Sequence, residues 1–171
     1  MGQYDFDDEQ NYRGGLVMID VLSKYAVVVP IGGRTPPDII EATKEALKKM
    51  GRKSKIVYTD DERGIASQEF NDFIEGEGIE LYRTRGHPAF AERMIRAFKD
   101  MFFFKRVEAD EKKGKKNIQW TDYILEIMLT YNNKNIHSAT GMTPKQASEK
   151  TNEFKAMINV ASKAKKESIL N

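Results

Sequence analysis

The residues from 55 to 64, KIVYTDDERG, place three consecutive acids directly after a short apolar run. Repulsion between neighbouring carboxylates raises their pKa values unless a cation lies nearby. Two interpretations of Asp60, Asp61 and Glu62 are therefore open: a solvated turn after a strand, or part of a metal site. A metal site needs acidic partners elsewhere in the chain.

Two further acids could complete such a site. Asp5 lies in a short alternating segment near the amino terminus, and Glu92 lies in a segment with helical periodicity. Two Mg²⁺ ions roughly 3.5–4 Å apart, held by carboxylates, would stabilise the attacking and leaving oxygens of a phosphoryl displacement. Arg96 and Lys99 follow Glu92 at steps of four and three residues, which return to one helix face. There the two cations would face the phosphates of a nucleic acid.

The composition restricts which cation could bind. The 171 residues include no cysteine and two histidines, His87 and His137, so thiol chemistry and cysteine-containing zinc sites are excluded. The formal net charge is only +2, so a DNA-binding surface must be local. No segment approaches the roughly 18 apolar residues of a membrane span, and the acidic start does not resemble a signal peptide. A bound metal should be a hard cation held by carboxylate oxygens.

The hydrophobic pattern predicts an α/β domain that positions these acids. Asp60 comes at the carboxyl end of the fourth expected strand, where the chemistry of open α/β sheets gathers. The basic segment 105–118 is expected to be a mobile loop. Residues 1–150 are expected to form one domain, followed by an amphipathic, basic tail at 151–171. Strands are expected near 2–6, 15–21, 24–30, 55–59 and 79–83, and helices near 36–50, 66–75, 89–104, 120–131 and from 144.

Other polar residues have simpler expected roles. Asp20 precedes a Leu-Ser turn, and we expect it to cap that turn rather than to bind metal. Thr35 and Gly51 are the expected start and stop signals of the helix near 36–50. His137 is expected to order its loop. His87 precedes the segment that carries Glu92 and could contact a substrate.

Five segments together resemble the catalytic core of retroviral-type integrases, especially those of large eukaryotic DNA transposons of the Maverick or Polinton type. They are QYDF, GLVMIDVLSKYAVVVPI, VYTDDERG, AERMIRAFK and YNNKNIHSATGMTPKQA, and the resemblance covers nearly all of residues 3–150. It implies a ribonuclease H-like fold, an α/β architecture with a mixed five-stranded sheet flanked by helices. It also implies a catalytic triad that binds Mg²⁺ or Mn²⁺, formed by Asp5, Asp60 and Glu92, with Asp5 and Asp60 on adjacent strands. Expected DNA contacts are His87, Arg93, Arg96 and Lys99.

The activity that this resemblance implies is a metal-dependent polynucleotidyl transferase and endonuclease. It would perform 3′-end processing and strand transfer on transposon ends and target DNA, in the nucleus and as a homo-oligomer. The alternative is a catalytically inactive integrase-like domain kept as a DNA-binding or assembly module. Several departures from the family pattern favour that alternative. Among them, the interval between Asp60 and Glu92 is shorter than is common in the family, and RGHPAFAE replaces a small polar loop. A nuclease acting on RNA–DNA hybrids shares the fold but lacks support from YNNKNIHSATGMTP.

Overall fold

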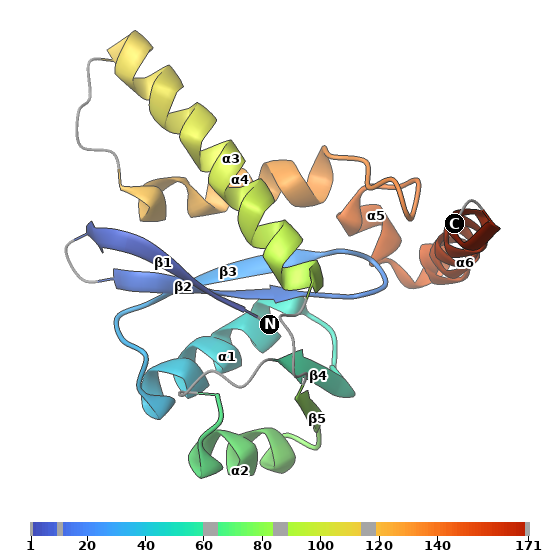
Figure 1. Ribbon diagram of the computed structural model, residues 1–171, viewed down its shortest axis with the longest axis horizontal. Coiled ribbons are helices and arrows are strands. Elements are labelled where there is room, and N and C mark those ends of the chain that lie inside the picture. Colours follow the sequence, from blue (N-terminus) through green and yellow to red (C-terminus); the bar gives the residue numbers. More distant parts are fainter. Residues whose placement is uncertain (1, 10–11, 60–64, 84–88, 114–118, 170–171) are drawn as a thin grey trace.

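A three-stranded antiparallel sheet, in the order β1-β2-β3, lies between α1 on one face and α3 with α4 on the other (Figure 1). A two-stranded parallel sheet, β4-β5, lies beside α1 and α2 (Figure 1). The structure is a computed structural model that describes residues 2–9, 12–59, 65–83, 89–113 and 119–169. Its elements are β1 Gly2–Glu9, β2 Tyr12–Ile19, β3 Ala26–Ile31, α1 Pro36–Met50, β4 Ile56–Thr59, α2 Gln68–Gly76, β5 Glu80–Arg83, α3 Ala89–Lys113, α4 Trp120–Asn133, α5 Pro144–Ala147, the 3-10 helix η1 Lys150–Asn152, and α6 Glu153–Ile169.

Strand β2 is buried on both faces because its side chains alternate between two apolar cores. Leu16 and Met18 pack in the core with α1 and α2, and Val17 packs in the core with α3 and α4. In β3, Val28 shares the second core with Val17. Antiparallel sheets commonly leave one face to solvent, with polar residues on it. Here helices cover both faces, which explains the near-continuous apolar sequences of β2 and β3.

Helix α1 begins and ends where its sequence signals predict. The Asp38 carboxylate accepts hydrogen bonds from the backbone N–H of Thr35, at 3.2 Å, and from its hydroxyl, at 2.5 Å. At the other end Gly51 has φ 64, and its N–H donates to the carbonyl of Lys48. A left-handed residue at this position suits glycine because it has no Cβ. Both expected signals are therefore confirmed.

The expected single five-stranded sheet is not formed. Among the described residues β1 pairs with β2, β4 pairs with β5, and no pairing joins β1 to β4. Val57 of β4 lies in the same apolar core as β2 and α1, so side-chain packing connects the two sheets where a hydrogen-bond ladder does not. On the opposite face of β4-β5, Tyr58 and Tyr82 stack on each other and are 46% and 45% exposed. The strands that carry Asp5 and precede Asp60 are thus not hydrogen-bonded neighbours in this part of the structure.

Helix α3 is longer than the sequence predicts. The expected end near residue 104 is wrong, because the helix continues to Lys113, and only residues 114–118 of the expected loop lie outside the described residues. Lys105 forms ion pairs with Glu108 one turn further along, at 3.6 Å, and with Glu126 on α4. Residues 105–113 contain no glycine or proline and consist mostly of strong helix formers. A charged segment without an apolar stripe can therefore still be helical, as residues 105–113 are.

The last part of the chain forms α6, which lies at one end of the molecule (Figure 1). Its side chains are mostly exposed, although Ala156 is fully buried against Met142 and Ala147. The structure does not test the division of the chain at residue 150, which stays a prediction. None of the helices in the described ranges is long and apolar enough for a membrane span.

Candidate active site and nucleic-acid interface

The first half of α3 presents one charged and one apolar face. Glu92, Arg96 and Lys99 are exposed, as their spacing predicted. The residues that anchor this part of the helix to the core are buried at steps of three and four, and they are Ala91, Met94 and Phe98. The apolar face therefore fixes the helix and turns the carboxylate of Glu92 and the two cations to solvent.

The strand that carries Asp5 lies beneath this helix. In β1, residue 5 pairs with Gly14 of β2, and the register of the two strands shifts between Asp5 and Glu9. Helix α3 contacts both β1 and β2. The side chain of Asp5 lies outside what the structure describes, so its direction toward Glu92 stays a prediction.

Asp60 and His87 lie outside the described residues, but the chain on both sides of residues 60–64 is anchored. Thr59 and Ile65 are both fully buried. Arg83 lies opposite Thr59 in the β4-β5 register, and its guanidinium donates to the carbonyl of Ile65 at 3.0 Å. The same guanidinium donates to Asn71 of α2. One side chain thus connects the end of β4 with the chain that follows residue 64.

The described residues contain no group of three or more histidines, aspartates or glutamates placed to hold a metal ion. This finding does not reach the expected triad, because Asp60 and the side chain of Asp5 lie outside those residues. The chemistry of the proposed donors fits a hard cation, since all three are carboxylates. Of the three, the structure places Glu92, on an exposed helix face.

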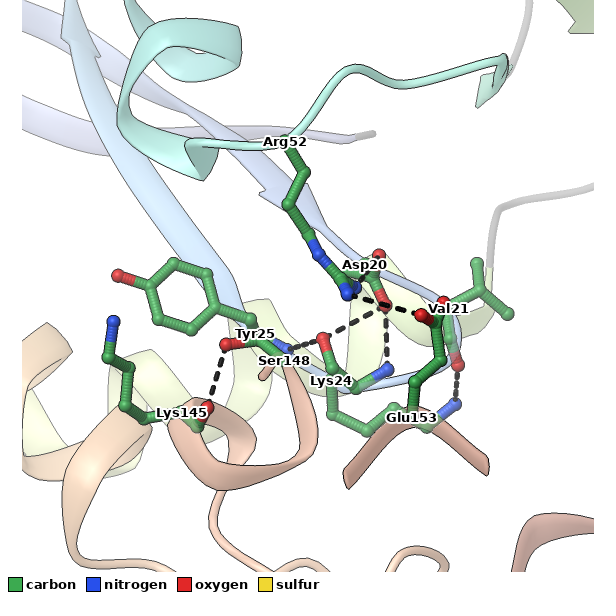
Figure 2. A network of polar contacts seen from close by, with 9 residues as sticks. Asp20, Val21, Lys24, Tyr25, Arg52, Lys145, Ser148 and Glu153 are labelled. Carbon is green, nitrogen blue, oxygen red and sulfur yellow. Dashed lines mark hydrogen bonds and ion pairs between the residues drawn. The ribbon is translucent and has the colours of Figure 1, made fainter. Parts of the chain in front are cut away.

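Asp20 has the turn-capping role that the sequence predicted (Figure 2). One of its carboxylate oxygens accepts from the backbone N–H of Ser23 at 2.6 Å and from the Ser23 hydroxyl at 2.9 Å. The other lies 3.9 Å from the guanidinium of Arg52, which is also 3.8 Å from the carboxylate of Glu153 (Figure 2). Asp20 therefore connects the β2–β3 turn to the start of α6.

The YNNKNIHSATGMTPKQA segment has structural roles that sequence reasoning only partly identified. Asn132 is buried, and its amide accepts from the N–H of Ala26 at 3.0 Å and donates to the carbonyl of Ala26 at 2.8 Å. The Nδ1 atom of His137 accepts from the N–H of Ala139 at 3.2 Å, which confirms that His137 orders its loop. The sequence signal for Asn132, a polar residue on the apolar face of α4, was present but did not reveal its partner.

Basic groups gather where this segment meets the β2–β3 turn. Lys24 is buried, and burial lowers the pKa of its ammonium group, an effect that Asp20 opposes and Arg93 reinforces. Burial also lowers the pKa of His137, and the positive charges of Lys24, Lys163 and Arg93 lower it further. Arg93, predicted to contact DNA, therefore lies close enough to this basic group to act on it electrostatically.

Comparison with solved structures identifies the fold. The chain is similar to the HTLV-2 integrase catalytic core domain in complex with magnesium, in its trimeric form (TM-score 0.70, 20% identity, 86% of this chain and 91% of that chain). The dimeric form of that domain matches almost equally well, with a TM-score of 0.69 and 20% identity over 86% of this chain and 90% of that one. A chain of the simian T-cell lymphotropic virus intasome in complex with PP2A regulatory subunit B56 gamma also matches, at 18% identity (TM-score 0.69, 86% of this chain and 51% of that chain).

No protein-family profile and no curated protein sequence matches the chain. The likeness to these structures therefore shows the fold, that of retroviral integrase catalytic cores, which is ribonuclease H-like α/β. Fold alone does not assign function. The assignment must come from the residues that the fold positions.

Proposed function

We propose that this chain is the catalytic core of a DNA integrase or transposase, which performs metal-dependent 3′-end processing and strand transfer on DNA. One observation carries the proposal: in an integrase-core fold, α3 presents Glu92 on an exposed face together with Arg96 and Lys99. A carboxylate beside two cations suits a site that must hold both a metal ion and a phosphate.

The proposed roles follow from side-chain chemistry. Asp5, Asp60 and Glu92 would hold Mg²⁺ or Mn²⁺, which when bound lowers the pKa of the attacking hydroxyl and neutralises charge on the phosphate. Arg96 and Lys99 bind backbone phosphates and so align the reacting strand. The proposal gives no covalent role to any side chain. His87 and Arg93 are proposed as further DNA contacts on either side of the start of α3.

Further parts of the proposal concern context. The solved neighbours include a magnesium complex in dimeric and trimeric forms, and we extend both properties to this chain as proposals: Mg²⁺ or Mn²⁺ as cofactor, and a homo-oligomer as the active species. The proposed substrates are the ends of a Maverick or Polinton-type transposon and its target DNA, which implies a nuclear location. The proposed catalytic core is residues 1–150, with 151–171 as an appended segment.

The test separates catalysis from binding. Asp60→Asn is expected to abolish strand transfer on a branched DNA substrate with Mn²⁺, and to leave DNA binding unchanged or tighter because a negative charge is removed. The double variant Arg96→Ala with Lys99→Ala is expected to bind more weakly, with the slope of log affinity against log salt reduced by roughly 0.9 per lost phosphate contact. Lys49→Ala is the control, since Lys49 is an exposed lysine on α1 that pairs with Glu45.

Two outcomes would contradict the proposal. Equal loss of DNA binding in the Asp60 variant and in the Arg96 and Lys99 double variant would indicate unfolding rather than separate roles. A wild-type chain that binds DNA but shows no activity with Mn²⁺ on branched or blunt substrates would favour the alternative of an inactive DNA-binding or assembly module.

A further inference from the structure

Four basic side chains from four separate elements lie close enough to act on one another beside the middle of α6. Lys24 comes from the β2–β3 turn, Arg93 from α3, His137 from the loop after α4, and Lys163 from α6. The charges of the other three all act on His137, and the charge of Arg93 also acts on Lys24. We call these four residues the α6-side basic cluster. Like charges repel, so such a group is stabilised when an anion binds to it.

Hydrogen bonds hold the loop that carries His137. The backbone N–H of His137 donates to the carbonyl of Met142 at 2.9 Å. Its Nδ1 atom accepts from the N–H of Ala139, so the neutral ring carries its proton on Nε2. Nε2–H is therefore a donor. Lys163 joins α6 to this loop by donating to the hydroxyl of Ser138 at 2.8 Å. A second bond, from the Asn159 amide to the carbonyl of Thr140 at 2.5 Å, fixes α6 against the same loop.

Lys24 supplies a positive charge from a buried position. Its backbone has φ 65, a left-handed conformation that is uncommon for a residue with a side chain. The side chain is buried, and its ammonium donates to the carbonyl of Val21 (Figure 2). A cation fixed below the surface raises the local potential without making a direct contact itself.

Two carboxylates near Lys24 are themselves paired with a cation. Asp20 and Glu153 both pair with Arg52 (Figure 2). Asp20 also accepts two hydrogen bonds from Ser23. Arg52 thus offsets part of their charge. Glu92 is adjacent to Arg93 in the sequence and is a proposed metal ligand. With a metal bound there, it too would be balanced.

We propose that Lys163, His137 and Arg93, above the fixed charge of Lys24, bind backbone phosphates of duplex DNA. The inference rests on the proposed function and deepens it. It adds to Arg96 and Lys99 a second phosphate-binding surface, which runs from the start of α3 over the 137–142 loop to α6. The DNA would then cross the Glu92 end of α3 and lie against the carboxyl-terminal helix.

The experiment measures binding of a fluorescent DNA duplex of roughly two helical turns to the full chain by anisotropy, over a range of salt concentrations. Lys163→Gln is expected to weaken binding about 3–10-fold at low salt and to reduce the salt slope by roughly 0.9. His137→Asn keeps an oxygen that can accept from Ala139 but removes Nε2–H, and we expect it to weaken binding about 2–5-fold.

Lys165→Gln is the matched control. It makes the same charge change on the same helix, but two residues correspond to roughly 200° around the helix axis, so Lys165 projects from the opposite side. We expect the control to change affinity less than about 2-fold, the modest effect of one exposed surface charge. Thermal unfolding of each variant within about 2 °C of wild type establishes that the fold is retained.

Each result bears on one of the two proposals. Equal losses for Lys163→Gln and Lys165→Gln, or no loss for Lys163→Gln, would overturn the inference even if the wild type were fully active in strand transfer. A loss confined to Lys163→Gln and His137→Asn would support it even if the wild type were catalytically inactive. An equal loss on an RNA duplex of the same length would overturn the assignment to DNA. No DNA binding by the wild type at low salt would overturn both proposals.

Discussion

Asn132 shows how a single buried amide positions one side of the sheet. Without Asn132, the N–H and the carbonyl of Ala26 in the edge strand β3 would face α4 with no hydrogen-bond partner. A buried backbone group without a partner costs free energy. Asn132 satisfies both groups, from a position 106 residues away in the chain. The segment that follows, with His137 and the basic cluster, starts from this anchor.

We therefore predict a large and specific effect of Asn132→Ala. Two hydrogen bonds are lost and two buried backbone groups are left unpaired, which should lower the free energy of unfolding by about 2–4 kcal/mol. Asn133→Ala is the control: Asn133 is exposed and donates only to the carbonyl of Leu129 in its own helix, so the change should stay within about 0.5 kcal/mol. Urea unfolding measures both values. Similar losses in the two variants would show that the Ala26 contacts contribute little.

Local residue roles could be predicted from the sequence, whereas those set by distant contacts could not. Turn and cap residues such as Asp20 and Gly51 act within a few positions of themselves, and the shared face of Glu92, Arg96 and Lys99 follows from helical spacing alone. The burial of Lys24 depends on elements that are far away in the sequence. For the proposed triad, sequence and fold place Glu92 and the strand of Asp5, while its convergence stays a prediction.

At the scale of elements, a charged junction joins the start of α6 to the core. Arg52, in the loop between α1 and β4, lies between Asp20 of the β2–β3 turn and Glu153 at the start of α6 (Figure 2). These side chains are partly exposed and their separations are near 4 Å, so each pair contributes modestly to stability, on the order of 0–1 kcal/mol. We therefore expect the junction to affect the position of α6 more than the free energy of unfolding.

Arg52→Gln is expected to loosen the start of α6 without unfolding the core. Amide hydrogen exchange should become about 3–10-fold faster in the first turns of α6, while global unfolding shifts by less than about 1 kcal/mol. Lys53→Gln is the control: it removes the same charge from the next residue, which is exposed. If exchange in α6 is unchanged in Arg52→Gln, then the other contacts of the helix fix it: the buried Ala156 and the hydrogen bonds from Asn159 and Lys163.

Element boundaries also show what the sequence pattern could not resolve. The apolar stripe of α3 predicted its first half because those residues face the sheet. Beyond residue 104 none of the side chains that the structure describes in α3 belongs to an apolar core, and the helix is favoured there by backbone propensity and by the pairing of Lys105 with Glu126. Hydrophobic periodicity indicates which helix residues are buried. A helical segment that extends past the core therefore has no apolar periodicity from which it could be predicted.

At the scale of the whole molecule, one group of large exposed apolar side chains lies on two helices that pack against each other. Phe103 and Phe104 of α3 are 62% and 69% exposed, and Leu125 and Leu129 of α4 are 71% and 53% exposed. Large exposed apolar surfaces on a soluble domain often mark an interaction site. Together with the proposed homo-oligomer, they favour self-association through the α3–α4 side of the molecule. Association there would leave the Glu92 end of α3 and the α6-side basic cluster accessible to DNA.

Leu125→Glu is therefore expected to weaken self-association at least about 10-fold, because an apolar side chain worth roughly 1.5–3 kcal/mol on burial is replaced by a charge. Ile136→Glu is the matched control, since Ile136 is also 71% exposed but lies in the loop beyond α4. It should change the dissociation constant less than about 2-fold, as a scattered surface residue would. Sedimentation equilibrium over a range of protein concentrations measures both. Equal weakening by the two variants would point to general charge repulsion, and a strictly monomeric wild type would mean that these side chains serve a different partner.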